Sequence, residues 1–171
     1  MRVIIYMAIT ANGYIAKEDG NTSFVSDASW NSWDKLSRGA GNLITGRKTF
    51  KIDLADGNFP YLDRFNVVMT SQKIENKWGN KVIFTDISPK EVLEVLAKKG
   101  FKTAFIGGGG ELNASFMKES LVDEIYLDIE PVIFGKGIKL FAESDLETRL
   151  ELLETKMLSK NLIQLHYKVI K

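Results

Sequence analysis

Short runs of apolar, often β-branched residues recur along the chain, and polar or helix-like connectors separate them. These runs lie at Val3–Ala8, Asn42–Thr45, Phe65–Thr70, Val82–Phe84, Lys102–Ile106 and Ile125–Phe134. Apolar runs of this length between polar connectors are typical of buried strands. Their alternation with helical stretches predicts an α/β fold with a mixed or mostly parallel sheet.

One helix is predicted by its start signal. The segment Ser88–Glu91 is a capping box with proline at the first helical position. We expect the helix that it opens to run to Gly100. Its apolar stripe is formed by Val92, Val95 and Leu96.

A second helix is predicted to begin near Asp27 or Ala28 and to end at about Arg38. Trp30 and Trp33 fall at helical spacing within it. Tryptophans in this arrangement serve either as core anchors or as a platform on which a ligand stacks. We favour the first interpretation, because aromatic side chains dominate core packing.

The C-terminal segment 147–171 fits two structures. Leucines at helical spacing favour a helix in its first half, whereas residues 162–168 alternate between apolar and polar side chains like a half-buried strand. Ser159–Asn161 makes a turn between the two halves. We therefore predict an antiparallel C-terminal hairpin.

Length and composition predict one globular domain over residues 1–171, because 44% of the residues are hydrophobic and 26% are charged. The net charge is +1, with both signs interspersed, so no surface for nucleic acid or for a membrane is expected. Without a cysteine, and with His166 as the single histidine, no metal site is expected. The N-terminus lacks the features of a signal peptide, and no stretch reaches about 20 apolar residues. A soluble, cytoplasmic protein is the expectation.

The run Gly107–Gly110 follows an apolar strand-like segment and precedes a helix-like stretch that ends at Glu119. Residues without Cβ let another molecule approach the backbone, and the first amides of a helix attract anions. Glycine runs also occur in flexible loops and at the ends of elements that bind nothing. Since the run matches neither the dinucleotide fingerprint nor the P-loop, support must come from other segments.

Three further segments have polar or turn-forming residues at the end of a predicted strand, where open α/β sheets bind nucleotides. A turn at Asn12-Gly13 leaves backbone groups of Ala8 and Ile15 free for a planar amide. Gly46–Thr49 combines bare backbone, two cations and a hydroxyl, and Thr70–Gln72 offers three hydrogen-bonding side chains. Taken singly, the first is an ordinary turn and the second a solvated basic turn.

Four segments in this order and spacing resemble the dihydrofolate reductase-like superfamily, in particular the branch of the riboflavin-biosynthesis reductase, the RibD C-terminal domain. They are residues 11–16, 45–50, 106–112 and the stretch from Leu121 to Phe141. The resemblance covers nearly the whole chain. It implies a mostly parallel central sheet with helices on both faces and an antiparallel C-terminal hairpin.

The resemblance also implies NADPH, laid across the strand ends. The implied contacts are Ala8 and Ile15 for the nicotinamide carboxamide, Gly46, Arg47, Lys48 and Thr49 for phosphates, Thr70, Ser71 and Gln72 for the adenosine ribose, and Gly107, Gly108, Gly109, Gly110, Glu111 and Leu112 for the pyrophosphate. The 2′-phosphate is expected between Ser71 and Arg47. A cis bond is expected between the first two glycines of the run.

The substrate side departs from dihydrofolate reductase, since Trp30 stands near the position of its helix carboxylate. Asp27 is the candidate proton donor, or else only the N-cap of its helix. Ser26 belongs to a loop expected beside the substrate. Arg64 matches an arginine that grips a folate tail, but an exposed ion pair is an equal alternative. Asp128 faces either the pocket or solvent.

The resulting hypothesis is an NADPH-dependent reductase that acts on a pterin or a ribosylaminopyrimidine-like small molecule, and the resemblance implies a homodimer. The alternative is a non-catalytic NADP(H)-binding protein of the same fold. A phosphotransferase is disfavoured, because no acidic metal-binding pair accompanies a P-loop lysine. His166 is expected to be structural, and a homodimer is expected to involve the strand at 125–134 and the C-terminal hairpin.

Overall fold

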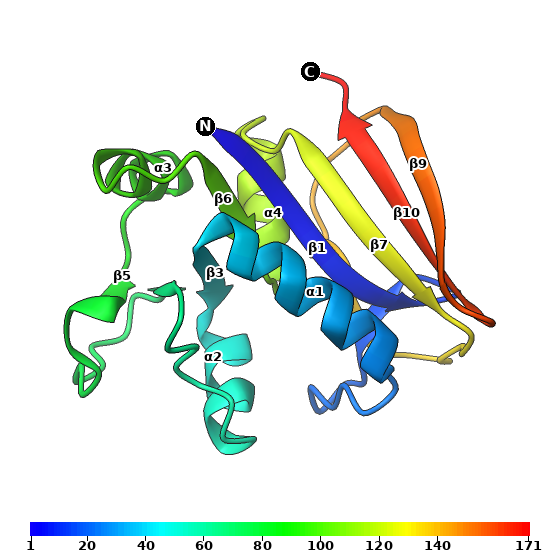
Figure 1. Cartoon of the computed structure of the whole chain (residues 1–171), viewed down its shortest axis with the longest axis horizontal. Helices are drawn as coiled ribbons and strands as arrows, with labels where there is room; N and C mark the ends of the chain where they lie inside the picture. The colour runs from blue at the N-terminus through cyan, green and yellow to red at the C-terminus, as the bar shows by residue number, and fades with distance from the viewer.

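The computed structural model describes all residues, 1–171. A twisted eight-stranded sheet runs through the molecule in the order β5-β4-β3-β6-β1-β7-β10-β9 (Figure 1). Its strands are β1 (Arg2–Thr10), β3 (Asn42–Gly46), β4 (Phe65–Met69), β5 (Val82–Thr85), β6 (Thr103–Ile106), β7 (Glu124–Glu130), β9 (Leu150–Ser159) and β10 (Leu162–Val169). Six neighbouring strands are parallel, and β10 pairs antiparallel with both β7 and β9. The predicted α/β fold with an antiparallel C-terminal hairpin is confirmed.

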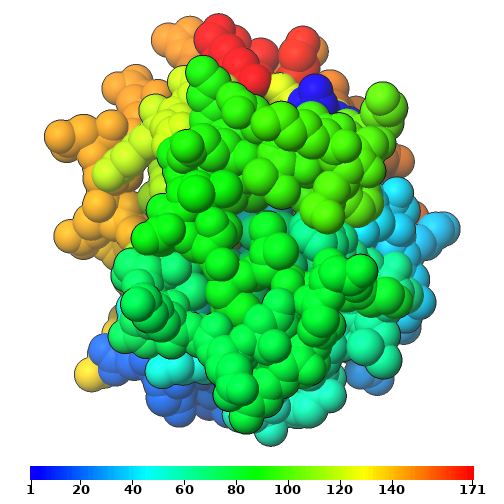
Figure 2. Space-filling view, turned by 90° about the vertical axis from the view of Figure 1, so that its left-hand side faces the viewer, coloured from blue at the N-terminus to red at the C-terminus, as the bar shows by residue number.

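Helices cover both faces of the sheet. They are α1 (Asp27–Ala40), α2 (Arg47–Ala55), α3 (Pro89–Lys98) and α4 (Gly110–Lys118), with a 3-10 turn at Gly79–Lys81. Alternate residues of β1 show the two faces: Ile4 and Tyr6 pack in a cluster with α1, whereas Val3 and Ile5 pack in the larger cluster with α3 and α4. The face that Figure 2 shows is covered largely by the green middle of the chain, which includes β5 and α3.

The helix predictions hold in detail at α3. Ser88 caps it, with the reciprocal Ser88–Glu91 hydrogen bonds of a capping box and proline in the first turn. The predicted strand at 125–134 is shorter, because β7 ends at Glu130 and the chain then turns toward β8 (Ile138–Lys139). There β8 pairs with β2 (Tyr14–Ala16) in a separate two-stranded sheet. No helix is long and apolar enough to span a bilayer.

The sheet opens on the carboxyl side of β6. β1 pairs with β6 only through residues 2–5, although β1 continues to Thr10, and β3 meets β6 at a single registered pair, Ile44 with Ile106. The glycine run begins where β6 ends, so β1 and β3 diverge around bare backbone. A crevice at the carboxyl ends of parallel strands is where open α/β sheets bind ligands.

Candidate functional site

One large cavity, of about 840 Å³, occupies this crevice. Most of the residues predicted to contact NADPH line it: Ala8, Ile15, Gly46, Arg47, Lys48, Thr49, Thr70, Ser71, Gly107, Gly109, Gly110, Glu111 and Leu112. Gly108 and Gln72 are adjacent to these residues but do not line the cavity. Segments separated by up to 100 positions in the sequence are thus brought to one wall.

Two helices start at this wall without a side-chain cap. The N-cap residues are Gly46 for α2 and Gly109 for α4, and neither can supply a capping oxygen. The first amides of each helix therefore lack the usual partner. α2 also carries Arg47 and Lys48 in its first turn and no acidic residue, which is unfavourable at the positive end of a helix dipole unless an anion is present. The donor set fits the phosphates of a dinucleotide.

The cations at this wall have weak partners. Arg47 donates from NH1 to Oε1 of Gln72 over 3.2 Å, which holds the guanidinium beside the exposed Ser71. The Nζ of Lys48 lies 2.8 Å from the carboxylate of Glu111, and both side chains are more than two-thirds exposed. Exposed pairs of this kind contribute little to stability, so an incoming phosphate can replace the carboxylate.

Ala8 and Ile15 lie where backbone groups are free of the main ladders. Ala8 belongs to the part of β1 that extends beyond β6, so its edge on that side has no partner strand. Ile15 lies at a register shift between the pairs Tyr14–Lys139 and Ala16–Ile138. The residue at such an irregularity is left out of the ladder. Both positions agree with the expectation of a planar amide bound to the backbone.

Close packing also explains why glycine, rather than a residue with a side chain, occupies positions at this wall. A Cβ on Gly107 would lie 2.7 Å from Leu43, and one on Gly110 would lie 2.4 Å from the backbone oxygen of Lys139. Gly108 has a φ of 91°, a conformation that side chains disfavour. The cis peptide joins Gly108 and Gly109, so the expectation of a cis bond between the first two glycines is wrong by one residue.

Asp27 lies outside the cavity. It is an exposed residue in the first turn of α1, and the N-cap is Ser26, whose hydroxyl accepts from the amide of Ser29. The interpretation of Asp27 as the cap is therefore wrong by one residue. Ser26 donates from its backbone amide and its hydroxyl to the Glu130 carboxylate, each over 2.8 Å, and also does not line the cavity. This geometry offers no support for Asp27 as a proton donor.

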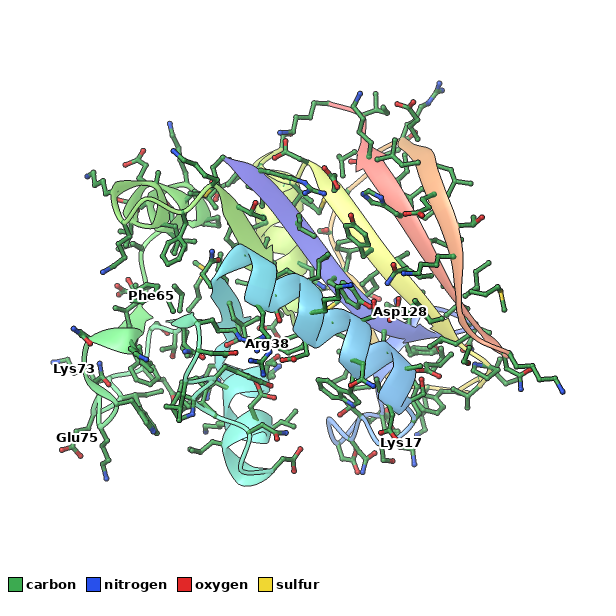
Figure 3. All side chains as sticks on the ribbon, viewed as in Figure 1. Lys17, Arg38, Phe65, Lys73, Glu75 and Asp128 are labelled. Atoms are coloured by element: carbon green, nitrogen blue, oxygen red, sulfur yellow. The ribbon has the colours of Figure 1, made fainter.

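Arg64 is buried and committed to other partners, so neither sequence interpretation describes it. Its Nε lies 2.9 Å from Asp63 and its NH2 lies 2.6 Å from Asp34, while NH1 contacts the Ser37 hydroxyl. Only 1% of its side chain is exposed, and it does not line the cavity. Arg38 pairs with the same two carboxylates, and Figure 3 labels it below α1.

Asp128 faces neither the cavity nor solvent. Its carboxylate is fully buried and accepts from the Tyr6 hydroxyl over 2.6 Å, from Ser29 over 2.6 Å and from Gln164 over 2.8 Å. Burial raises the pKa of Asp128, while these donors oppose the shift. Figure 3 shows Asp128 on β7 beside α1. It reaches the cavity only indirectly, through Tyr6 and Ser29, which line it.

Among the carboxyl groups that line the cavity, the buried one is Asp53, on α2. It is 8% exposed, and burial raises its pKa to about 7, with the nearby Asp56 carboxylate adding to the shift and a hydrogen bond from Tyr61 opposing it. Sequence reasoning missed this residue. Asp53 follows Thr49 by four positions, which places both on one face of a helix, so the predicted ligand role of Thr49 was the available signal.

Aromatic rings surround this end of the cavity. Trp30 and Trp33 meet edge to face, with ring centroids 5.7 Å apart, and Trp33 packs 5.4 Å from Tyr61. All three line the cavity, and Trp30 is 39% exposed, so it is not a core anchor. Trp33 also packs on Phe105 of the sheet. The pair therefore combines both predicted roles, one ring in the core and one facing the cavity.

No cluster of His, Asp and Glu suited to a metal ion is present. His166 lies away from the cavity, where it stacks on Tyr126 with ring centroids 3.9 Å apart and its Nε2 lies 2.6 Å from Glu124. These contacts join β10 to β7, where Tyr126 is the residue in register with His166. They agree with a structural role.

The sequence model of the RibD C-terminal domain matches residues 1–164. The chain belongs to the RibD C-terminal domain family. The uncharacterized protein YwjB of Bacillus subtilis (strain 168) is 31% identical to it over an alignment of 170 positions, which covers 97% of each chain. The family assignment therefore rests on nearly the full length, as the sequence motifs implied.

Solved structures show the same fold. A candidate riboflavin biosynthesis protein from Shewanella sp. PV-4 has a TM-score of 0.83 at 23% identity, over 100% of both chains. A deaminase/5-amino-6-(5-phosphoribosylamino)uracil reductase from Thermotoga maritima has a TM-score of 0.77 at 16% identity, over 99% of this chain and 56% of that one. Dihydrofolate reductase from Enterococcus faecalis, complexed with NADP(H), has a TM-score of 0.72 at 20% identity, over 99% and 97%. These likenesses establish a dihydrofolate reductase-like fold for this RibD C-terminal domain.

Proposed function

We propose that this RibD C-terminal domain is an NADPH-dependent reductase of a small heterocycle or sugar-derived imine. The observation that carries the proposal is one cavity with two chemically different ends. Uncapped helix starts with Arg47 and Lys48 form one end, and Asp53 with aromatic rings forms the other. A dinucleotide and a planar substrate require this combination in a single crevice.

When bound, NADPH supplies a hydride at C4 of its nicotinamide. The chain's own part is to bind and orient. The amides at the starts of α2 and α4 and the side chain of Arg47 hold phosphates, while backbone groups at Ala8 and Ile15 hold the carboxamide. Such positioning of two reactants supplies several kcal/mol of the barrier reduction, on the order of 7 kcal/mol in favourable cases.

Asp53 is the proton source in this proposal. Its raised pKa of about 7 leaves the carboxyl group partly protonated at neutral pH, in contact with the cavity that the substrate enters. A general acid is most effective when its pKa lies near the working pH. The proton remains available to a ring nitrogen or an imine nitrogen of the substrate, and Tyr61 holds the carboxyl group in place.

The test is a screen of NADPH oxidation with dihydrofolate, the ribosylaminopyrimidine of the riboflavin pathway, and a set of carbonyl compounds. The rival function is a non-catalytic NADP(H)-binding protein. It is favoured by the position of Asp27, whose carboxyl group does not line the cavity. Turnover of any compound removes the rival. Binding of NADPH without turnover of any compound would support it, and failure to bind NADPH would contradict both functions.

A homodimer through the C-terminal hairpin belongs to the same proposal. β9 is an edge strand, and it exposes Leu152 (53%), Leu153 (47%) and Met157 (59%). Long apolar edge strands are usually covered by a partner. Analytical ultracentrifugation is expected to show a dimer that Leu153→Glu converts to a monomer. A wild-type monomer at all concentrations would contradict it.

A further inference from the structure

We infer that the substrate end of the cavity selects a planar heterocycle without an anionic tail, so that a phosphate or carboxylate on the substrate weakens binding. The inference rests on the proposed function and names its substrate class. It follows from the placement of the charged groups around Asp53, Tyr61 and Trp30.

The arginine best placed in sequence to receive an anionic tail is not free to do so. Every nitrogen of the Arg64 guanidinium has a partner on Asp63, Asp34 or Ser37, and 1% of its side chain is exposed. Together with Arg38, it forms a cluster of two cations and two carboxylates that is electrically balanced. To reach Arg64, an anion would have to displace these carboxylates from a guanidinium that is itself buried, which is unfavourable.

The remaining cations of the cavity come from one short segment. Arg47, Lys48 and Lys51 all lie in the first half of α2, and no other lysine or arginine lines the cavity. Arg47 and Lys48 face the phosphate end, where Gln72 and Glu111 are their partners. Only Lys51 is left near the substrate end, and it is exposed to solvent.

The substrate end itself carries acidic groups. Glu18 and Asp19 line it from the loop after β2, and the backbone of the next residue, Gly20, packs against Ile52 of α2. That contact places the acidic loop against α2, the helix that carries Asp53. The carboxylate of Glu18 lies 3.3 Å from the Nζ of Lys136, which is far away in the sequence, whereas Asp19 forms no ion pair. An anionic group here would meet the carboxylates of Glu18 and Asp19 and one solvent-exposed cation, Lys51, so repulsion prevails.

What this end offers instead suits an uncharged or cationic ring. Trp30 provides a partly exposed aromatic face, and Asp53 with Tyr61 provides a carboxyl and a hydroxyl for ring N–H and carbonyl groups. Burial raises the pKa of Asp53, so a negative charge at this position is costly. A neutral planar heterocycle adds none.

The test compares ligands that differ only in an anionic group, on protein saturated with NADP+. One pair is 6-hydroxymethylpterin and 6-carboxypterin, and the other is a ribosylaminopyrimidine and its 5′-phosphate. Calorimetric titration at pH 7.5 is expected to give at least tenfold tighter binding for the uncharged member, with a smaller gap at 0.5 M salt because salt screens repulsion. Equal or tighter binding of the charged members would overturn the inference, and so would failure of all four to bind.

Charge-reversal variants localise the effect. Asp19→Lys is expected to narrow the gap between the members of each pair several-fold. Glu75→Lys is the matched control, because Glu75 is 81% exposed in the loop after β4, at the edge of the molecule in Figure 3, and does not line the cavity. An equal effect of both variants would contradict a local cause. The heat of NADP+ binding, recorded first, reports separately on the proposed function.

Discussion

Replacement of Asp53 by asparagine tests whether the cavity holds a protonated carboxyl group. The group ionises at about 7 in the folded protein and has a reference value of 3.8, a difference of about 3 pKa units. At 1.36 kcal/mol per unit, this corresponds to about 4 kcal/mol. Asparagine keeps the shape of the side chain but cannot lose a proton.

The direction in which stability changes with pH depends on whether the folded or the unfolded state binds the proton of Asp53 more tightly. Below about pH 4 the carboxyl group is protonated in both the folded and the unfolded chain, so it adds no pH dependence. Between about pH 4 and pH 7 the unfolded chain releases its proton first, and the folded state loses stability as pH rises. Above about pH 7 both states are ionised and the contribution is constant.

The assay is urea unfolding of wild type and Asp53→Asn from pH 4 to pH 8. As pH rises across this range, the unfolding free energy of wild type is expected to fall by about 4 kcal/mol relative to that of the variant. Asp56→Asn should shrink the change, since the Asp56 carboxylate contributes to the raised pKa. A difference that stays constant from pH 4 to pH 8 would refute the reasoning, together with the role of Asp53 as a proton source.

Four further variants probe the two ends of the cavity and the network beneath it. Arg47→Ala should reduce the preference for NADPH over NADH about tenfold or more in titrations of each cofactor, because a charged hydrogen bond contributes about 1.5–3 kcal/mol; an unchanged preference contradicts this. Gly110→Ala should lower the unfolding free energy by about 1–3 kcal/mol, since its Cβ would lie 2.4 Å from the Lys139 oxygen. Gly46→Ala, whose nearest contact would be an ordinary 3.8 Å, should instead keep stability and weaken NADPH binding. Asp128→Asn should cost about 2–4 kcal/mol in urea unfolding, because three donors lose a charged acceptor; a cost below about 1 kcal/mol would show that the network tolerates a neutral amide.

The wall of the cavity that holds the glycines and helix starts was predictable from sequence, because backbone geometry determines it. Glycines and strand ends have local signals, and helix starts follow from propensity and capping, as Gly46 and the box at Ser88 show. Positions shift by one residue where two neighbours compete for the same role, as with the Ser26 cap and the Gly108–Gly109 peptide.

The substrate end was not predictable, because its residues act through tertiary contacts. Whether Arg64 meets a ligand or two carboxylates depends on where α1 brings Asp34, which no local pattern reveals. The same holds for Asp53, whose altered pKa comes from burial beneath neighbouring aromatic rings. Matching Arg64 by sequence position alone therefore predicted a ligand contact, whereas in the fold Arg64 binds two carboxylates.

Calorimetric titration of this RibD C-terminal domain with NADPH and with NADH tests the central claim most directly. The account predicts one NADPH bound per chain, with NADH at least tenfold weaker and the difference lost in Arg47→Ala. Absence of binding for both nucleotides at millimolar concentration would contradict it.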